Sequence, residues 1–122
     1  MASIRLIVRA AEVHEEDTGN HIIRCNEYAY LMANKVGMPT DFCVEIHYSA
    51  QLHDIGKMSV NSAIFTKRGR FDDDERFEMN QHTTYGHQIL ARPERLQMAA
   101  EIAHSHHEHW DGSSYPQGLK GE

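Results

Sequence analysis

The chain has 122 residues, the usual length of one domain, so we expect a single hydrophobic core. Its 12 Lys and Arg against 18 Asp and Glu give a formal net charge of −6, which disfavours a nucleic-acid-binding surface because such surfaces are basic. No apolar run approaches the length of a membrane span or a signal peptide, and two cysteines outside any C-x-x-C motif favour a reduced, cytoplasmic protein. Histidine is the unusual residue. Ten of 122 residues are His, which indicates a metal site.

Apolar residues recur at helical spacing along most of the chain, and no segment alternates as a strand would, so we predict an all-α fold. The predicted helices cover residues 4–11, 20–36, 40–52, 72–81, 84–91 and 93–106. Residues 57–71 are predicted to be a loop with at most one short turn, and the tail from Asp111 onward is also predicted to be loop.

Short local signals predict several of the helix ends. Gly37 followed by Pro39 is typical of a helix that stops, and Thr40 or Asp41 is expected to cap the next helix. Asp72, with Glu75 three residues later, has the pattern of a capping box at a helix start.

The candidate ligands fall into four short elements, each on or beside a predicted helix. They are Asp17 and His21, four residues apart; His53 and Asp54; His82; and His106 and His107. Taken singly, each element fits an exposed polar pair or a helix cap as well as a ligand. Together they offer nitrogen and oxygen ligands without thiolate, which suits Mn, Fe, Co, Ni or Zn. Five histidines and two carboxylates exceed what one tetrahedral ion needs, so the set predicts a two-metal centre, a device for in-line displacement at phosphorus.

Two longer motifs resemble those of a known family. Residues 53–57 (HDIGK) are similar to the signature of the HD phosphohydrolase superfamily, and residues 106–122 (HHEHWDGSSYPQGLKGE) resemble the signature of its HD-GYP branch. Asp17 to His21 and the His82-x-x-x-Gly86 element fall in the family's order. The resemblance implies an all-α HD-domain helical bundle spanning residues 1–122. It also implies a phosphodiesterase that hydrolyses cyclic di-GMP through a metal-bridging hydroxide, with Fe or Mn as the usual metals.

The resemblance also implies roles for individual residues. Asp54 matches the carboxylate that bridges two ions, and Asp17 falls where some members carry a longer glutamate that helps to hold a third metal. Lys57 matches a lysine beside the phosphate, where an ammonium group would neutralise transition-state charge, and Tyr115 matches a tyrosine that touches substrate. The implied metal ligands are His21, His53, Asp54, His82, His106 and His107.

Two departures from the family pattern leave alternatives open. Ser114 replaces the first glycine of the Gly-Tyr-Pro motif, a position where glycine allows close approach or positive φ. The chain also ends at Glu122, before the family's C-terminal helices and their further aspartate ligand, so we expect a truncated domain with an exposed apolar face that favours a homodimer. The alternatives are a regulatory module that keeps metal without turnover and an HD hydrolase of another phosphoester.

The family context implies partners as well as a substrate. Members are fused to receiver or sensor domains on the N-terminal side, and a GGDEF domain is an expected partner of the Gly-Tyr-Pro-like loop. The remaining histidines are not predicted ligands. His14 and His47 are predicted to lie on the surface without an acidic or histidine partner in register, and His109 is predicted to be solvated. His104 is predicted to lie partly in the core or beside the ligands, and the family pattern requires nothing at His87. Cys25, Cys43 and Trp110 are predicted to pack in the core.

Overall fold

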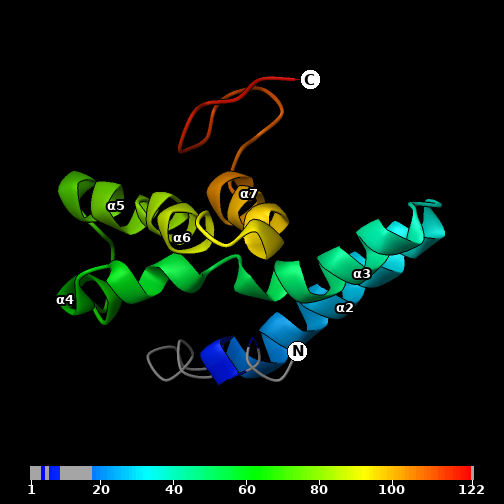
Figure 1. Ribbon diagram of the computed structural model, residues 1–122. Coiled ribbons are helices and arrows are strands. Elements are labelled where there is room, and N and C mark those ends of the chain that lie inside the picture. Colours follow the sequence, from blue (N-terminus) through cyan, green and yellow to red (C-terminus); the bar gives the residue numbers. More distant parts are fainter. Residues whose placement is uncertain (1–3, 5, 9–17, 122) are drawn as a thin grey trace. The chain divides into compact units, whose positions relative to one another are not determined.

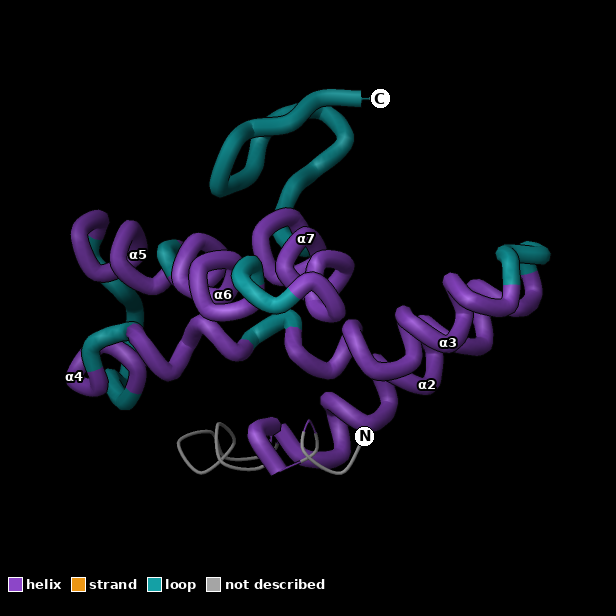
Figure 2. The backbone as a smooth tube through the Cα atoms, viewed as in Figure 1, coloured by secondary structure: helices purple, strands orange, loops and turns teal. Residues whose placement is uncertain are grey.

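The computed structural model describes residues 4, 6–8 and 18–121, and it divides into two compact units, residues 1–52 and 53–122. Helices make up the regular structure of the described residues, and an isolated bridge between Asp111 and Lys120 is the β pairing found among them (Figures 1 and 2). The predicted all-α class is therefore confirmed. None of the described helices is long and apolar enough to cross a membrane.

The first unit is built on an antiparallel pair of helices, α2 (Thr18–Lys35) and α3 (Thr40–Ser49), followed by the 3-10 turn η1 (Ala50–Leu52) (Figure 1). Gly37 ends α2 as predicted: its φ of +82° lets the amide of Met38 donate back to the carbonyl of Ala33 over 3.0 Å. The predicted cap of α3 is wrong, because Pro39 occupies the N-cap position and no side chain caps that helix.

The second unit carries the other elements. They are η2 (Ile55–Ser59), α4 (Ser62–Phe65), α5 (Asp73–Asn80), α6 (His82–Leu90), η3 (Glu94–Leu96) and α7 (Gln97–Ser105). The predicted loop at 57–71 is thus partly helical, since η2 and α4 fall in it. The capping box of α5 is confirmed, because the Asp72 carboxylate accepts from the Glu75 amide over 2.8 Å.

Three small residues let the backbones of the second unit approach closely. A Cβ on Gly56 would lie 1.8 Å from the carbonyl oxygen of His82 and 2.4 Å from the amide of Gly86. A Cβ on Gly86 would in turn lie 3.1 Å from the side chain of Ala103. Glycine at 56 therefore allows η2 to cross α6, and this crossing brings the start of η2 beside the first residue of α6.

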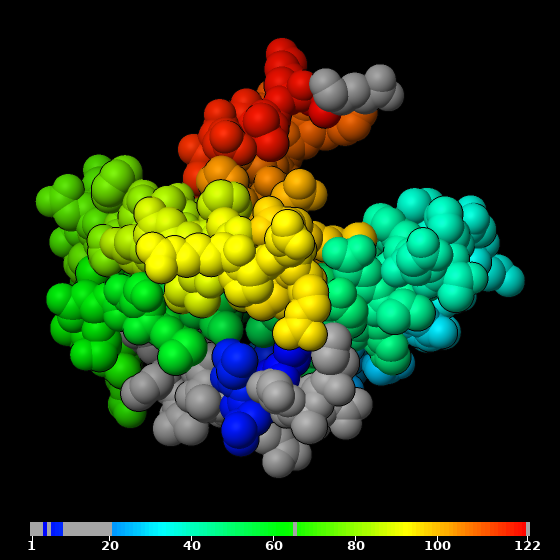
Figure 3. All heavy atoms as spheres, viewed as in Figure 1, coloured from blue at the N-terminus to red at the C-terminus, as the bar shows by residue number. Residues whose placement is uncertain are grey.

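After α7 the chain forms a closed loop. The carboxylate of Glu108 accepts from the amides of Gln117 and Leu119 at 2.7 and 3.0 Å, and the bridge between Asp111 and Lys120 closes the loop at its base. In the space-filling view this segment, drawn in orange to red, projects from the end of α7 (Figure 3). The predicted loop conformation of the tail is confirmed.

Candidate metal centre

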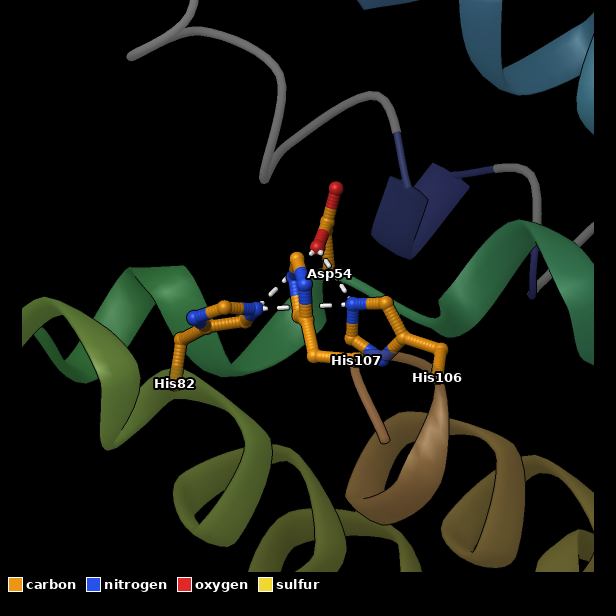
Figure 4. Close-up of side chains that lie close together, drawn as sticks. All are labelled: Asp54, His82, His106 and His107. Atoms are coloured by element: carbon orange, nitrogen blue, oxygen red, sulfur yellow. Dashed lines mark hydrogen bonds and ion pairs between the residues drawn. The ribbon is translucent and has the colours of Figure 1, made fainter. Parts of the chain in front are cut away.

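Four side chains of the second unit converge at one point. Asp54, His82, His106 and His107 each offer a ligand atom, and these atoms all lie within 4.8 Å of one another (Figure 4). They come from three places in the sequence: the turn before η2, the first residue of α6, and the end of α7. The close crossing at Gly56 and Gly86 is what brings these places together.

Backbone carbonyls fix the orientation of two of these imidazoles. His82, which is only 2% exposed, donates Nδ1–H to the carbonyl of Met79 over 2.7 Å. His106 donates Nδ1–H to the carbonyl of Ala103 over 3.0 Å. In each neutral ring the lone pair is then on Nε2, the arrangement typical of histidines that bind a metal.

Both Nε2 atoms face the same oxygen of Asp54. The distances to Oδ1 are 3.4 Å from His82 and 3.2 Å from His106, and the two Nε2 atoms lie 3.5 Å apart. Two lone pairs and a carboxylate oxygen at such distances repel one another unless a proton or a cation lies among them. The donor set thus fits a metal ion.

The second oxygen of Asp54 has different neighbours. Oδ2 lies 3.1 Å from Nε2 of His53 and 3.4 Å from the ammonium of Lys57. His53 also contacts His106 edge to face, with ring centroids 5.0 Å apart. One carboxylate therefore presents its two oxygens to two groups of side chains, as a bridging ligand would.

The electrostatic environment keeps Asp54 and His107 in their ligand forms. Burial works to raise the pKa of Asp54, but its contacts with the imidazoles of His106, His53 and His82 lower that pKa far below its usual value. Burial, followed by the charges of His106 and His82, lowers the pKa of His107 to about 4. At neutral pH the site therefore offers a carboxylate anion and, at His107, a neutral imidazole.

The C-terminal loop supplies an aromatic wall to this site. The ring of Tyr115 stacks on His107, with centroids 4.8 Å apart and planes 21° apart. Burial and the charge of Asp54 raise the pKa of Tyr115, whereas the positive charges of Lys57 and Arg76 oppose that rise. Lys57 and Tyr115, both predicted from the sequence, thus adjoin the cluster.

Arg76 is a neighbour that the sequence analysis missed. It lies on α5, its guanidinium sits over the ring of Phe71 at 5.3 Å from the centroid, and its charge acts on Tyr115. An exposed arginine on a helix rich in acidic residues carries no motif, so no sequence signal distinguishes it.

The first unit contains the remaining predicted ligands. His21 lies on α2, exposed to solvent, with Cys25 one turn later and its Sγ 3.5 Å from Nε2 of His21. Asp17 lies outside the described residues. The roles of both in metal binding stay predictions.

Several other sequence expectations are also settled. Trp110 is 73% exposed, so its predicted place in the core is wrong, and Cys25 is only partly buried whereas Cys43 is buried as predicted. His47 is not isolated, because it pairs with Glu27 at 2.7 Å and stacks on Tyr30. His109 is exposed as predicted, and His14 lies outside the described residues.

Comparison with known proteins identifies the family. Residues 5–122 match the HD domain family, to which the chain therefore belongs. It is 40% identical over 119 residues to a cyclic di-GMP phosphodiesterase of Thermotoga maritima, covering 96% of this chain and 32% of the relative.

Two relatives from Vibrio cholerae serotype O1 are similar as well. The chain is 37% identical to a 3'3'-cGAMP-specific phosphodiesterase 2 and 38% identical to a cyclic di-GMP phosphodiesterase. These matches cover 95% and 92% of this chain but only 23% and 26% of the relatives. The resemblance to the HD-GYP branch is confirmed, and the chain spans a third or less of these curated relatives.

Proposed function

We propose that this chain is part of a metal-dependent phosphodiesterase that hydrolyses a cyclic dinucleotide, with cyclic di-GMP as the first candidate. The observation that carries the proposal is the pair of Nε2 lone pairs, on His82 and His106, that face one oxygen of Asp54. The names of the relatives support the substrate class, since they act on cyclic di-GMP or 3'3'-cGAMP.

The proposed cofactor is a pair of divalent ions, Fe or Mn, with Zn, Ni and Co also compatible with the ligand types. Bound metal would supply an activated water and stabilise negative charge on phosphate oxygens. The two oxygens of Asp54, each with its own set of neighbours, support a bridging role. The proposed ligands are His21, His53, Asp54, His82, His106 and His107. Asp17 is one methylene shorter than the glutamate of some family members, which favours two ions over three.

The other residues near the cluster would bind and orient the substrate. Lys57 places an ammonium beside Asp54, where it would contact a non-bridging phosphate oxygen, and Arg76 adds a second cation near Tyr115. The stacked ring of Tyr115 would limit the position of the phosphate. In the reaction, water adds to phosphorus, the P–O3′ bond breaks, and the 3′ oxygen leaves with a proton to give a linear dinucleotide.

The test uses the full-length protein loaded with Mn²⁺ or Fe²⁺ and incubated with cyclic di-GMP and, separately, 3'3'-cGAMP. We expect a linear dinucleotide from at least one substrate, with loss of product in Asp54→Asn and retention in Asp74→Asn, an exposed aspartate on α5. A folded, metal-loaded protein that yields no linear product contradicts the proposal. If it still binds the dinucleotide, the regulatory module with Ser114 in its loop is the better description.

The proposed partners of this protein are a receiver or sensor domain on the N-terminal side, a GGDEF domain at the C-terminal loop, and a second copy of the chain in a homodimer. The exposed Trp110 and Leu119 on the loop support a protein contact there. At the end of α2, the apolar side chains of Leu31 and Met32 and of the following Val36 are likewise exposed, which supports a contact between copies.

A further inference from the structure

A second pair of histidines lies on the same two helices as the candidate metal centre. His87 of α6 and His104 of α7 have ring centroids 4.7 Å apart, with planes tilted by 39°. Both side chains are half-buried, and neither ring has a hydrogen-bond partner among the described residues. Two imidazoles with unused ring nitrogens are thus held side by side at a partly exposed position.

This pair has the spacing of the imidazoles in the candidate metal centre. There, the ring centroids are 4.3 Å apart for His106 and His107, 5.1 Å for His82 and His107, and 5.4 Å for His82 and His106. The value of 4.7 Å falls within that range. The two rings of the second pair are therefore as closely spaced as those of the candidate metal centre.

The pair is separate from the first centre. His104 contacts the ring of His87, whereas His107 contacts the rings of His82, His106 and Tyr115, and among the described residues no ring contact joins the two groups. His87 follows His82 by five residues and points to another face of α6. Between the two sites lies the close contact of α6 with α7, where a Cβ on Gly86 would lie 3.1 Å from Ala103.

The scaffold under the pair is rigid enough for a bidentate site. α6 and α7 pack against each other, and both contribute buried residues: Leu90 on α6, and Ala99 and Ala103 on α7. Because the helices already hold both rings in contact, metal binding would cost little ordering of the side chains. Water would complete the coordination, since imidazole suits Zn, Cu, Ni and Co and a carboxylate is not required.

We propose that His87 and His104 form a second binding site for a divalent transition metal ion, outside the HD centre and independent of the proposed phosphodiesterase activity. The ion would cross-link α6 and α7. Because α6 begins at His82 and α7 ends at Ser105, just before His106, such a cross-link would stabilise the two helices that carry the HD centre.

Zn²⁺ stoichiometry tests the site. Equilibrium dialysis of the full chain against buffered Zn²⁺ measures the number of ions bound per chain. His87→Gln and His104→Gln should each bind one ion fewer than the unchanged protein, or bind the last ion with an affinity lower by about tenfold or more. The matched control is His109→Gln, an exposed histidine whose Nδ1 is already bonded to Ser113, and it should bind as much Zn²⁺ as the unchanged chain.

The HD centre is distinguished by His82→Gln, which should lose ions from that centre and keep the one that depends on His87. Glutamine keeps the variants polar and of similar size, and circular dichroism establishes that each is folded. If either variant fails to fold, Cu²⁺ electron paramagnetic resonance provides the test. The unchanged chain should show a Cu²⁺ site with two imidazole nitrogens, and His82→Gln should keep that site. Equal Zn²⁺ binding by the unchanged chain and both variants, or no such Cu²⁺ signal, overturns the proposal.

Discussion

Asp54 is the residue on which the candidate metal centre depends. Its carboxylate is 21% exposed, yet it faces three imidazoles and an ammonium, and it is the anion that these groups share. Without it, the lone pairs of His82 and His106 would face each other at 3.5 Å with no negative charge to balance a cation. The carboxylate therefore determines whether the cluster can hold metal.

We expect Asp54→Asn to lower metal affinity by about a hundredfold or more, because it removes the charge and keeps the shape. Elemental analysis after dialysis measures the metal retained per chain. Asp74→Asn, an exposed change on α5, is the matched control and should retain the metal of the unchanged protein. Equal metal content in Asp54→Asn and its control would contradict the assignment.

Two fully buried hydroxyl groups should affect the folding stability in opposite directions. Ser49 Oγ has no hydrogen-bond partner in the described part of the chain, whereas Thr83 Oγ1 donates to the carbonyl of Asn80 over 3.0 Å. We expect Ser49→Ala to stabilise the protein by about 1 kcal/mol, because it removes an unpaired buried polar group. Thr83→Val should destabilise it by about 1 kcal/mol, because it breaks a satisfied bond. Urea denaturation measures both, and the same sign for the two variants would refute this account.

At the scale of elements, the packing of η2 against α6 depends on one missing side chain. Gly56 has no room for a Cβ, since the nearest atoms are backbone atoms of His82 and Gly86, which cannot turn aside. Any side chain at 56 must therefore push α6 away, and the proposed ligand His82 moves with it.

We expect Gly56→Ala to cost about 3 kcal/mol or more of folding stability, and to reduce metal affinity in whatever folded protein remains. Gly69→Ala is the control: its φ of +101° makes alanine strained there, but no atom lies within 4 Å, so a cost of about 1 kcal/mol is expected. Thermal unfolding and metal content measure both effects. A Gly56→Ala protein as stable as Gly69→Ala would show that the crossing tolerates a shift.

Local sequence signals predicted the end of α2 and the start of α5 correctly, failed at the cap of α3, and gave no indication of the shortest elements. The glycine at 37 and the capping box at Asp72 act on their immediate neighbours, so the sequence alone places the end of α2 and the start of α5. η2 and α4 are only five and four residues long, too short for a periodic apolar pattern, and tertiary packing holds them.

The same distinction applies to the candidate site. Asp54, His82, His106 and His107 belong to recognisable motifs, and the structure brings them together as the resemblance implies. Sequence patterns did not predict the place of Arg76, the pairing of His47 with Glu27 or the exposure of Trp110. These features depend on contacts between residues far apart in sequence or on loop placement, which no local pattern encodes.

At the scale of the whole molecule, the convergent side chains of the candidate metal centre all come from the second unit. Its four convergent side chains, the flanking His53 and Lys57, and the stacked Tyr115 all lie within residues 53–122. Metal binding should therefore act first on the stability of that unit, since a metal that binds only the folded state stabilises it by mass action.

Acid should destabilise this protein, and more so with metal bound. The pKa of His107 is lowered from 6.5 to about 4 in the folded state, so between these values the unfolded chain binds more protons and stability falls as pH falls. Burial and the neighbouring His87 lower the pKa of His104 as well, which acts in the same direction. The lowered pKa of Asp54 adds a further loss below its usual value of 3.8.

Metal makes this dependence steeper, because imidazole ligands must lose their protons before they bind it. We expect the free energy of unfolding to fall between pH 6.5 and 4, and the fall to be larger for the metal-loaded protein than for the metal-free one. Urea denaturation at several pH values, with and without Mn²⁺, measures it. His107→Gln should flatten the metal-free curve in that range, whereas His109→Gln should not. A flat curve for the unchanged protein would mean that neutral His107 contributes nothing to folding, and equal slopes with and without Mn²⁺ would exclude imidazole ligation.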